Sequence, residues 1–126
     1  MASLEPDMPT AGPVVTGFAG NAFRLDEEII EGGLWLTPES ARPWDIADMA
    51  GLKVETLAPL LALAPSPEFL LLGTGARLER PSPAFVSAVE ALDIGVEAMD
   101  SRAAARAWGM LRSEDRWIVA ALLPIH

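Results

Sequence analysis

The sequence predicts an α/β fold: a single three-layer domain in which helices flank a central mixed, mostly parallel sheet, with short antiparallel strands near the N-terminus. Two observations predict it. The run Phe69 to Leu72 contains four consecutive apolar residues without alternation, as expected of a strand covered on both faces. From Thr56 onward the order helix, strand, helix, strand, helix, strand favours a partly parallel sheet with helices on its faces.

The length of 126 residues fits one domain that buries its own core. We expect residues 14–126 to form this domain. Residues 1–13 contain three prolines among small and acidic residues, and we expect them to be a flexible arm. No apolar run approaches the roughly 18 to 20 residues of a membrane span, so no integral membrane segment is expected.

The chain is acidic, with a formal net charge of −9 and most of the excess in residues 1–72. This charge opposes binding to nucleic acid or to anionic lipid, either of which would require a basic patch. The absence of cysteine excludes disulfides, thiolate zinc sites and a cysteine nucleophile. Because the single histidine is the terminal His126, we expect no catalytic triad, metal site or cofactor.

Short strands bounded by Gly, Asn or Asp are predicted in the first part of the chain. Trp35 and Trp44 would cover the core or a sheet edge. A helix beginning near Thr56 would place Pro59 in its first turn, where proline is tolerated. The predicted strands span residues 14–18, 22–25, 28–31, 33–37 and 43–46.

The second part contains two better-marked helices. Ser82 precedes a proline and is the expected N-cap of a helix over residues 83–92. A strand is predicted over residues 95–99, and Asp100-Ser101 would then cap a helix that runs to about Arg112. Residues 117–123 form a second apolar run, whose direction relative to its neighbours the sequence leaves open.

One group of predicted loop residues could bind a ligand or take part in a reaction. If the strands ending at Leu72 and Met99 are parallel neighbours, the loops that follow them emerge together, where open α/β sheets bind ligands. Free N–H groups, hydroxyls and nearby arginines would suit an anion. The alternative, a tight turn with ordinary helix capping, stays open, because a lone Gly-Thr-Gly is no phosphate-binding fingerprint. The candidate crevice comprises Gly73, Thr74, Gly75, Arg77, Met99, Asp100, Ser101, Arg102 and Arg106.

The sequence also resembles a small α/β domain family of unknown function that includes mitochondrial complex I (NADH:ubiquinone oxidoreductase) assembly factor 3. The resemblance covers about residues 14–123 and implies a three-layer fold with a central mixed sheet. For the eukaryotic members it implies a role in assembling complex I through protein contacts. The segments that carry it are Gly33-Leu-Trp-Leu-Thr-Pro38, Trp44, Phe69-Leu-Leu-Leu-Gly-Thr-Gly75, Gly95-Val-Glu-Ala-Met-Asp-Ser101, Ala103-Ala104, Arg106 and Val119-Ala-Ala-Leu122.

The chain departs from this family at two places. Ala105 stands where many members have cysteine, which excludes a catalytic thiol there, and Trp108-Gly109 replaces Tyr-Asn. The N-terminus also lacks a basic amphipathic leader. We therefore expect a bacterial, cytoplasmic member that reaches the inner membrane only through its partners.

Two hypotheses follow from these observations. In the first, the protein is a non-enzymatic interaction module whose partners are complex I subunits or assembly factors, and a weak homodimer is compatible with so apolar a domain. In the second, it is an anion-binding protein or an enzyme that uses the crevice between Gly73–Gly75 and Met99–Ser101. We favour the first, because the residues supply no complete catalytic set.

Overall fold

The computed structural model describes residues 12–126 and arranges them in a five-stranded sheet, a separate three-stranded antiparallel sheet and flanking helices. Residues 1–11 of the predicted arm lie outside the described residues. The strands are β1 (Gly17–Ala19), β2 (Ala22–Leu25), β3 (Glu28–Ile30), β4 (Gly33–Leu36), β5 (Ala41–Trp44), β6 (Phe69–Gly73), β7 (Gly95–Met99) and β8 (Val119–Leu122).

The five-stranded sheet has the order β5-β4-β8-β6-β7. Strand β8 is in the centre, and β6 lies between it and β7 and pairs in parallel with both. Strand β4 pairs antiparallel with β8 and with β5, so β4 alone runs against the others. The sheet is mixed, as predicted. The direction of β8, which the sequence left open, is parallel to β6.

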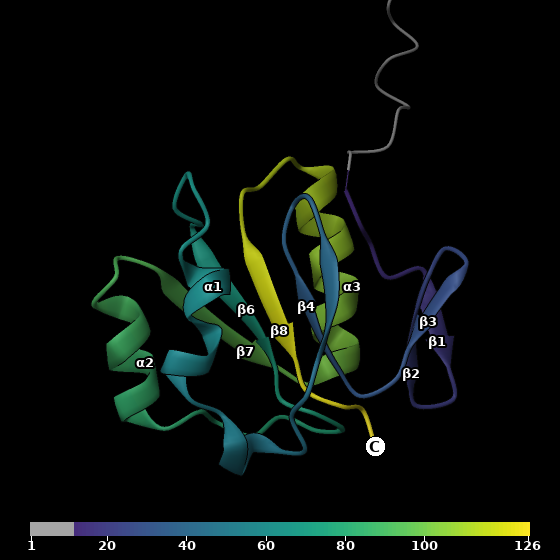
Figure 1. Cartoon of the computed structure of the whole chain (residues 1–126), viewed down its shortest axis with the longest axis horizontal. Helices are drawn as coiled ribbons and strands as arrows, with labels where there is room; N and C mark the ends of the chain where they lie inside the picture. The colour runs from purple at the N-terminus through teal and green to yellow at the C-terminus, as the bar shows by residue number, and fades with distance from the viewer. Residues whose placement is uncertain (1–11) are drawn as a thin grey trace, which may run out of the picture.

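Helices cover both faces of this sheet and give the three predicted layers (Figure 1). Helix α3 (Ser101–Ser113) lies on one face, where Leu71 and Trp108 belong to one core cluster. Helices α1 (Ala58–Leu61) and α2 (Pro83–Glu90) lie on the other, where Leu70 and Leu72 belong to a second cluster. Neighbouring leucines of β6 face opposite cores. Because both faces of this strand are buried, polar and apolar residues do not alternate along its sequence.

Capping signals in the sequence correspond to helix starts. The Ser82 side chain accepts a hydrogen bond from the Phe85 N–H at the start of α2. Asp100 does the same for the Ala103 N–H at the start of α3. Both hydrogen bonds satisfy N–H groups that have no acceptor within the helix, which is why these two boundaries could be predicted.

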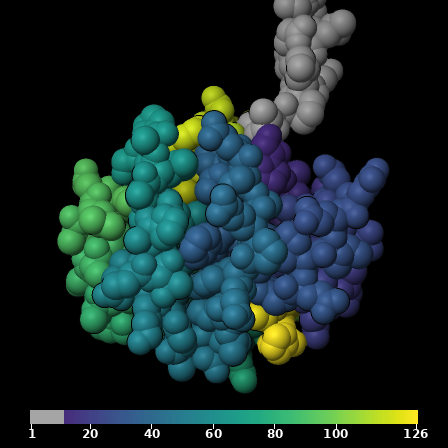
Figure 2. All heavy atoms as spheres, in the orientation of Figure 1, coloured from purple at the N-terminus to yellow at the C-terminus, as the bar shows by residue number. Residues whose placement is uncertain are grey.

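The helix expected from Thr56 is shorter than predicted. A 3₁₀ turn over Val54–Leu57 leads into the four residues of α1, and Pro59 lies in its first turn, as predicted. Pro65 disfavours the helical region for the residue before it, but α1 already ends at Leu61, before that limit. Another 3₁₀ turn spans Met49–Gly51. This irregular stretch covers much of the sheet face seen in Figure 2, leaving only small areas of the yellow C-terminal segment visible.

The tryptophans hold peripheral segments to the sheet. Trp44 is buried and lies beside the half-buried Trp35, with ring centroids 6.0 Å apart, in agreement with the predicted covering role. The indole N–H of the fully buried Trp108 donates to the Pro13 carbonyl at 2.9 Å.

None of the helices in residues 12–126 combines the length and apolar character needed to cross a bilayer.

The double burial of β6 can be tested with adjacent substitutions. Leu70→Ala and Leu71→Ala should each lower the free energy of unfolding by about 2–5 kcal/mol, because each leaves a cavity in a different core. Met110→Ala, at a side chain that is 65% exposed, should change it by less than about 0.5 kcal/mol. Urea unfolding measures all three. A small effect for either leucine would contradict burial on that face.

Candidate functional site

The carboxyl ends of β6, β7 and β8 lie together at one end of the sheet. The Leu123 N–H donates to the Gly73 carbonyl at 2.9 Å, which joins β8 to β6. The Thr74 N–H donates to the Met99 carbonyl at 2.9 Å, and the Ser101 N–H donates to the Gly75 carbonyl at 2.8 Å. The structure therefore brings together the two segments that the sequence predicted to form a crevice.

The Ser101 hydroxyl lies at the centre of this junction and is fully buried. It donates to the Leu123 carbonyl at 2.7 Å and accepts from the Gly75 N–H at 2.9 Å. A Cβ on Gly73 would lie 2.8 Å from the Ser101 hydroxyl oxygen and 2.9 Å from its Cα. The absence of a side chain at Gly73 is thus what allows α3 to begin so close to β6.

The other polar groups of the crevice also have partners within the protein. The Thr74 hydroxyl donates to the Arg77 carbonyl at 2.7 Å and accepts from the Glu79 N–H at 3.0 Å. Asp100 is occupied as the N-cap of α3. Binding of an anion at this junction stays a prediction, and a ligand would have to displace these hydrogen bonds.

The arginines of the candidate crevice point elsewhere or into solvent. Arg77 is exposed. The guanidinium carbons of Arg102 and Arg106 lie 5.6 and 5.7 Å from the ring centroid of Phe18 in β1. These cation–π contacts connect α3 to the three-stranded sheet. The structure does not bring these two side chains to the Gly73–Gly75 turn.

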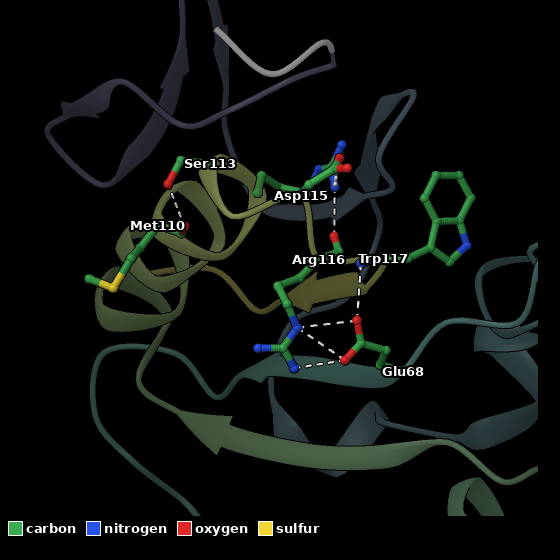
Figure 3. A network of polar contacts seen from close by, with 7 residues as sticks. Glu68, Met110, Ser113, Asp115, Arg116 and Trp117 are labelled. Atoms are coloured by element: carbon green, nitrogen blue, oxygen red, sulfur yellow. Dashed lines mark hydrogen bonds and ion pairs between the residues drawn. The ribbon is translucent and has the colours of Figure 1, made fainter. Parts of the chain in front are cut away.

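A polar network at the opposite ends of the strands was not predicted (Figure 3). Glu68 precedes β6 and Arg116 precedes β8. The Arg116 guanidinium donates to the Glu68 carboxylate from Nη2 at 2.7 Å and from Nε at 3.1 Å. The Trp117 N–H donates to the same carboxylate at 3.3 Å, and the Glu68 N–H donates to the Trp117 carbonyl at 2.8 Å.

This ion pair favours the ionised form of Glu68. Hydrogen bonding from Arg116 is the main cause that lowers the pKa of the Glu68 carboxyl below its usual value of 4.5, and it raises the pKa of Arg116. The sequence does place opposite charges, Glu68 and Arg116, before two apolar strands. These charges would have predicted an ion pair only if the two strands had been known to be parallel neighbours.

Comparison with known proteins gives a consistent family match. Residues 15–123 match a family described as "Protein of unknown function (DUF498/DUF598)". An uncharacterized protein of Rhodobacter capsulatus is 36% identical and aligns over 99% of this chain and 94% of its own length. A Danio rerio protein named NADH dehydrogenase (ubiquinone) 1 alpha subcomplex assembly factor 3 is 30% identical over 97% of this chain.

The chain spans 70% of the length of the Danio rerio protein and 58% of the length of a Xenopus tropicalis protein with the same name. Solved structures are also similar. A crystal structure from Bordetella parapertussis has a TM-score of 0.82 and 34% identity, and covers 91% of this chain and 98% of its own. A solution structure from Bordetella pertussis, described as a Mth938-like domain, has a TM-score of 0.78 and 28% identity, with 94% and 89% covered.

The role of Ser101 at the junction predicts the effect of removing its hydroxyl. Ser101→Ala should lower the free energy of unfolding by about 1–3 kcal/mol, because the Gly75 N–H and the Leu123 carbonyl lose a buried partner. Ser87→Ala, at an exposed position of α2, is the matched control and should change it by less than about 0.5 kcal/mol. Equal unfolding midpoints in urea for the two variants would contradict this role.

The Glu68–Arg116 pair predicts a pH dependence. Since the folded protein lowers the pKa of Glu68, the carboxylate stabilises the fold fully above pH 4.5, and this contribution disappears as the pH falls through the lowered pKa. Glu68→Gln should therefore melt at a lower temperature than wild type at pH 7, with the difference shrinking in acid. In an Arg116→Gln background the effect of Glu68→Gln should be smaller, because only the Trp117 N–H still donates to the carboxylate. A difference between Glu68→Gln and wild type that is independent of pH would refute the assignment.

Proposed function

Because this chain belongs to the family of proteins of unknown function DUF498/DUF598, we propose that it takes part in the assembly of respiratory complex I. The observation that carries the proposal is its 30% identity with the Danio rerio assembly factor 3 over 97% of the chain. The matched region, residues 15–123, includes every strand of both sheets. Any role shared with the named assembly factors would therefore reside in this domain.

We propose further that the protein acts through protein contacts and not by catalysis. The polar groups at the strand ends support this, because the hydroxyls of Ser101 and Thr74 and the carboxylate of Asp100 are hydrogen-bonded to the backbone. A catalytic group must reach a substrate, whereas these groups hold strands and a helix in place. The net charge of −9 also favours protein partners over nucleic acid.

The proposed partners are complex I subunits or other assembly factors. The similarity to the Rhodobacter capsulatus protein over nearly the full length of both chains supports a bacterial setting. There the protein would work from the cytoplasm, at the periphery of the inner membrane, and its partners would bring it to the membrane.

Deletion of the gene in its native host tests this proposal. We expect NADH:ubiquinone oxidoreductase activity of the membranes to fall and partly assembled complex I to accumulate on native gels, with both restored by the wild-type gene. Succinate dehydrogenase activity is the control and should not change. Full-size complex I with undiminished activity in the deletion strain would refute an assembly role.

A further inference from the structure

The two edges of the five-stranded sheet differ in how they are protected. Exposed sheet edges attract further strands, and proteins block unwanted pairing with prolines and charged residues. The β5 edge has both, in the exposed Arg42 and Pro43. The β7 edge has five residues, Gly95–Met99, with no proline and one charged residue, Glu97. Strand β7 thus has little of the protection that β5 has.

Backbone groups of β7 are available for pairing. The Gly95 N–H donates to the Glu68 carbonyl, and the Met99 carbonyl accepts from the Thr74 N–H, so both residues face inward. In a parallel ladder alternate residues pair on alternate sides, which directs the N–H and C=O groups of Val96 and Ala98 outward. Within residues 12–126, no strand pairs with this side and no backbone hydrogen bond joins it to the loop over residues 76–82.

A hollow of about 680 Å³ adjoins this edge, and both apolar and polar side chains line it, Arg80 and Ser87 among the polar ones. Its apolar lining includes Val96 and Ala98 of β7, Val86 of α2 and Leu78 of the preceding loop. Leu78 is 55% exposed, so its side chain is accessible to a partner at this edge. Because side chains alternate along a strand, the exposed Glu97 lies on the opposite face. The edge therefore offers backbone groups between a partly apolar hollow on one face and the Glu97 carboxylate on the other.

We infer that the outer edge of β7 is a docking site for an extended segment of another protein, which adds to the sheet as a further strand. Its backbone would pair with Val96 and Ala98, an aliphatic side chain would enter the hollow beside Leu78, and a lysine or arginine would lie near Glu97. This mode of recognition combines backbone hydrogen bonds for affinity with alternate side chains for specificity. The inference deepens the proposed function, since it rests on the protein acting through protein contacts.

Charge distinguishes this partner from a second copy of the chain. The antiparallel register that pairs all five β7 residues of two copies places Glu97 directly opposite Glu97, and like charges in that position are destabilising. Each copy also carries a net charge of −9. A basic and aliphatic segment of a different protein matches the edge better on both counts.

Panning a phage-displayed library of random 12-residue peptides on the immobilised full chain tests the inference. We expect enriched peptides to alternate aliphatic residues with lysine or arginine. Ala98→Pro removes one outward N–H that the sheet does not use, and it should weaken peptide binding at least about tenfold with little change in melting temperature. Leu78→Asp leaves the backbone unchanged and provides the same test if Ala98→Pro does not fold.

A pair of charge reversals completes the design. Glu97→Lys should weaken binding of the basic peptides at least about tenfold, whereas the control Glu31→Lys, at an exposed residue after β3, should not. The inference is overturned if no peptide is enriched or if the peptides bind the edge variants as tightly as wild type. It is also overturned if wild type is a dimer that Ala98→Pro converts to a monomer. Since panning does not involve complex I, these results are independent of the gene-deletion result.

Discussion

Strand β6 is held on all of its sides, and the rest of the structure depends on that constraint. It pairs with β7 and β8, and its leucines are buried in both cores. Its start is fixed by the Glu68–Arg116 pair and its end by the Ser101 hydroxyl. Because both fixed points also hold β8 or the segment beside it, β8 must run parallel to β6, and α3 must begin directly above the Gly73 turn.

Features that depend on neighbouring residues could be predicted from the sequence. Features that depend on contacts between distant parts of the chain could not. The bounds of β7 and the caps at Ser82 and Asp100 were predicted correctly, because strand length and capping depend on neighbouring residues. The direction of β8 depends on contacts with β4 and β6, which no local pattern encodes. Arg102 and Arg106 were assigned to the crevice from their spacing, but Phe18, more than eighty positions earlier in the chain, determines where they point.

The arrangement of polar groups bears on the proposed role. At the carboxyl ends of the strands, where α/β proteins often bind ligands, Ser101 and Thr74 are hydrogen-bonded to the chain itself. The backbone groups directed outward belong instead to Val96 and Ala98, beside the hollow that Leu78, Val86 and Arg80 also line. A domain whose strand ends are closed by its own side chains and whose sheet edge is open is suited to binding another polypeptide, which is what the proposed role requires.

The account requires β6 to be constrained on every side and the outer side of β7 to be open, and amide hydrogen exchange followed by NMR measures both at once. We predict that the amides of Leu70, Leu71 and Leu72 exchange only through global unfolding. Within β7, the amide of Glu97 should be protected by its bond to β6, whereas those of Val96 and Ala98 should exchange rapidly. Equal protection of Val96, Glu97 and Ala98, or early exchange of the β6 amides, would contradict the account.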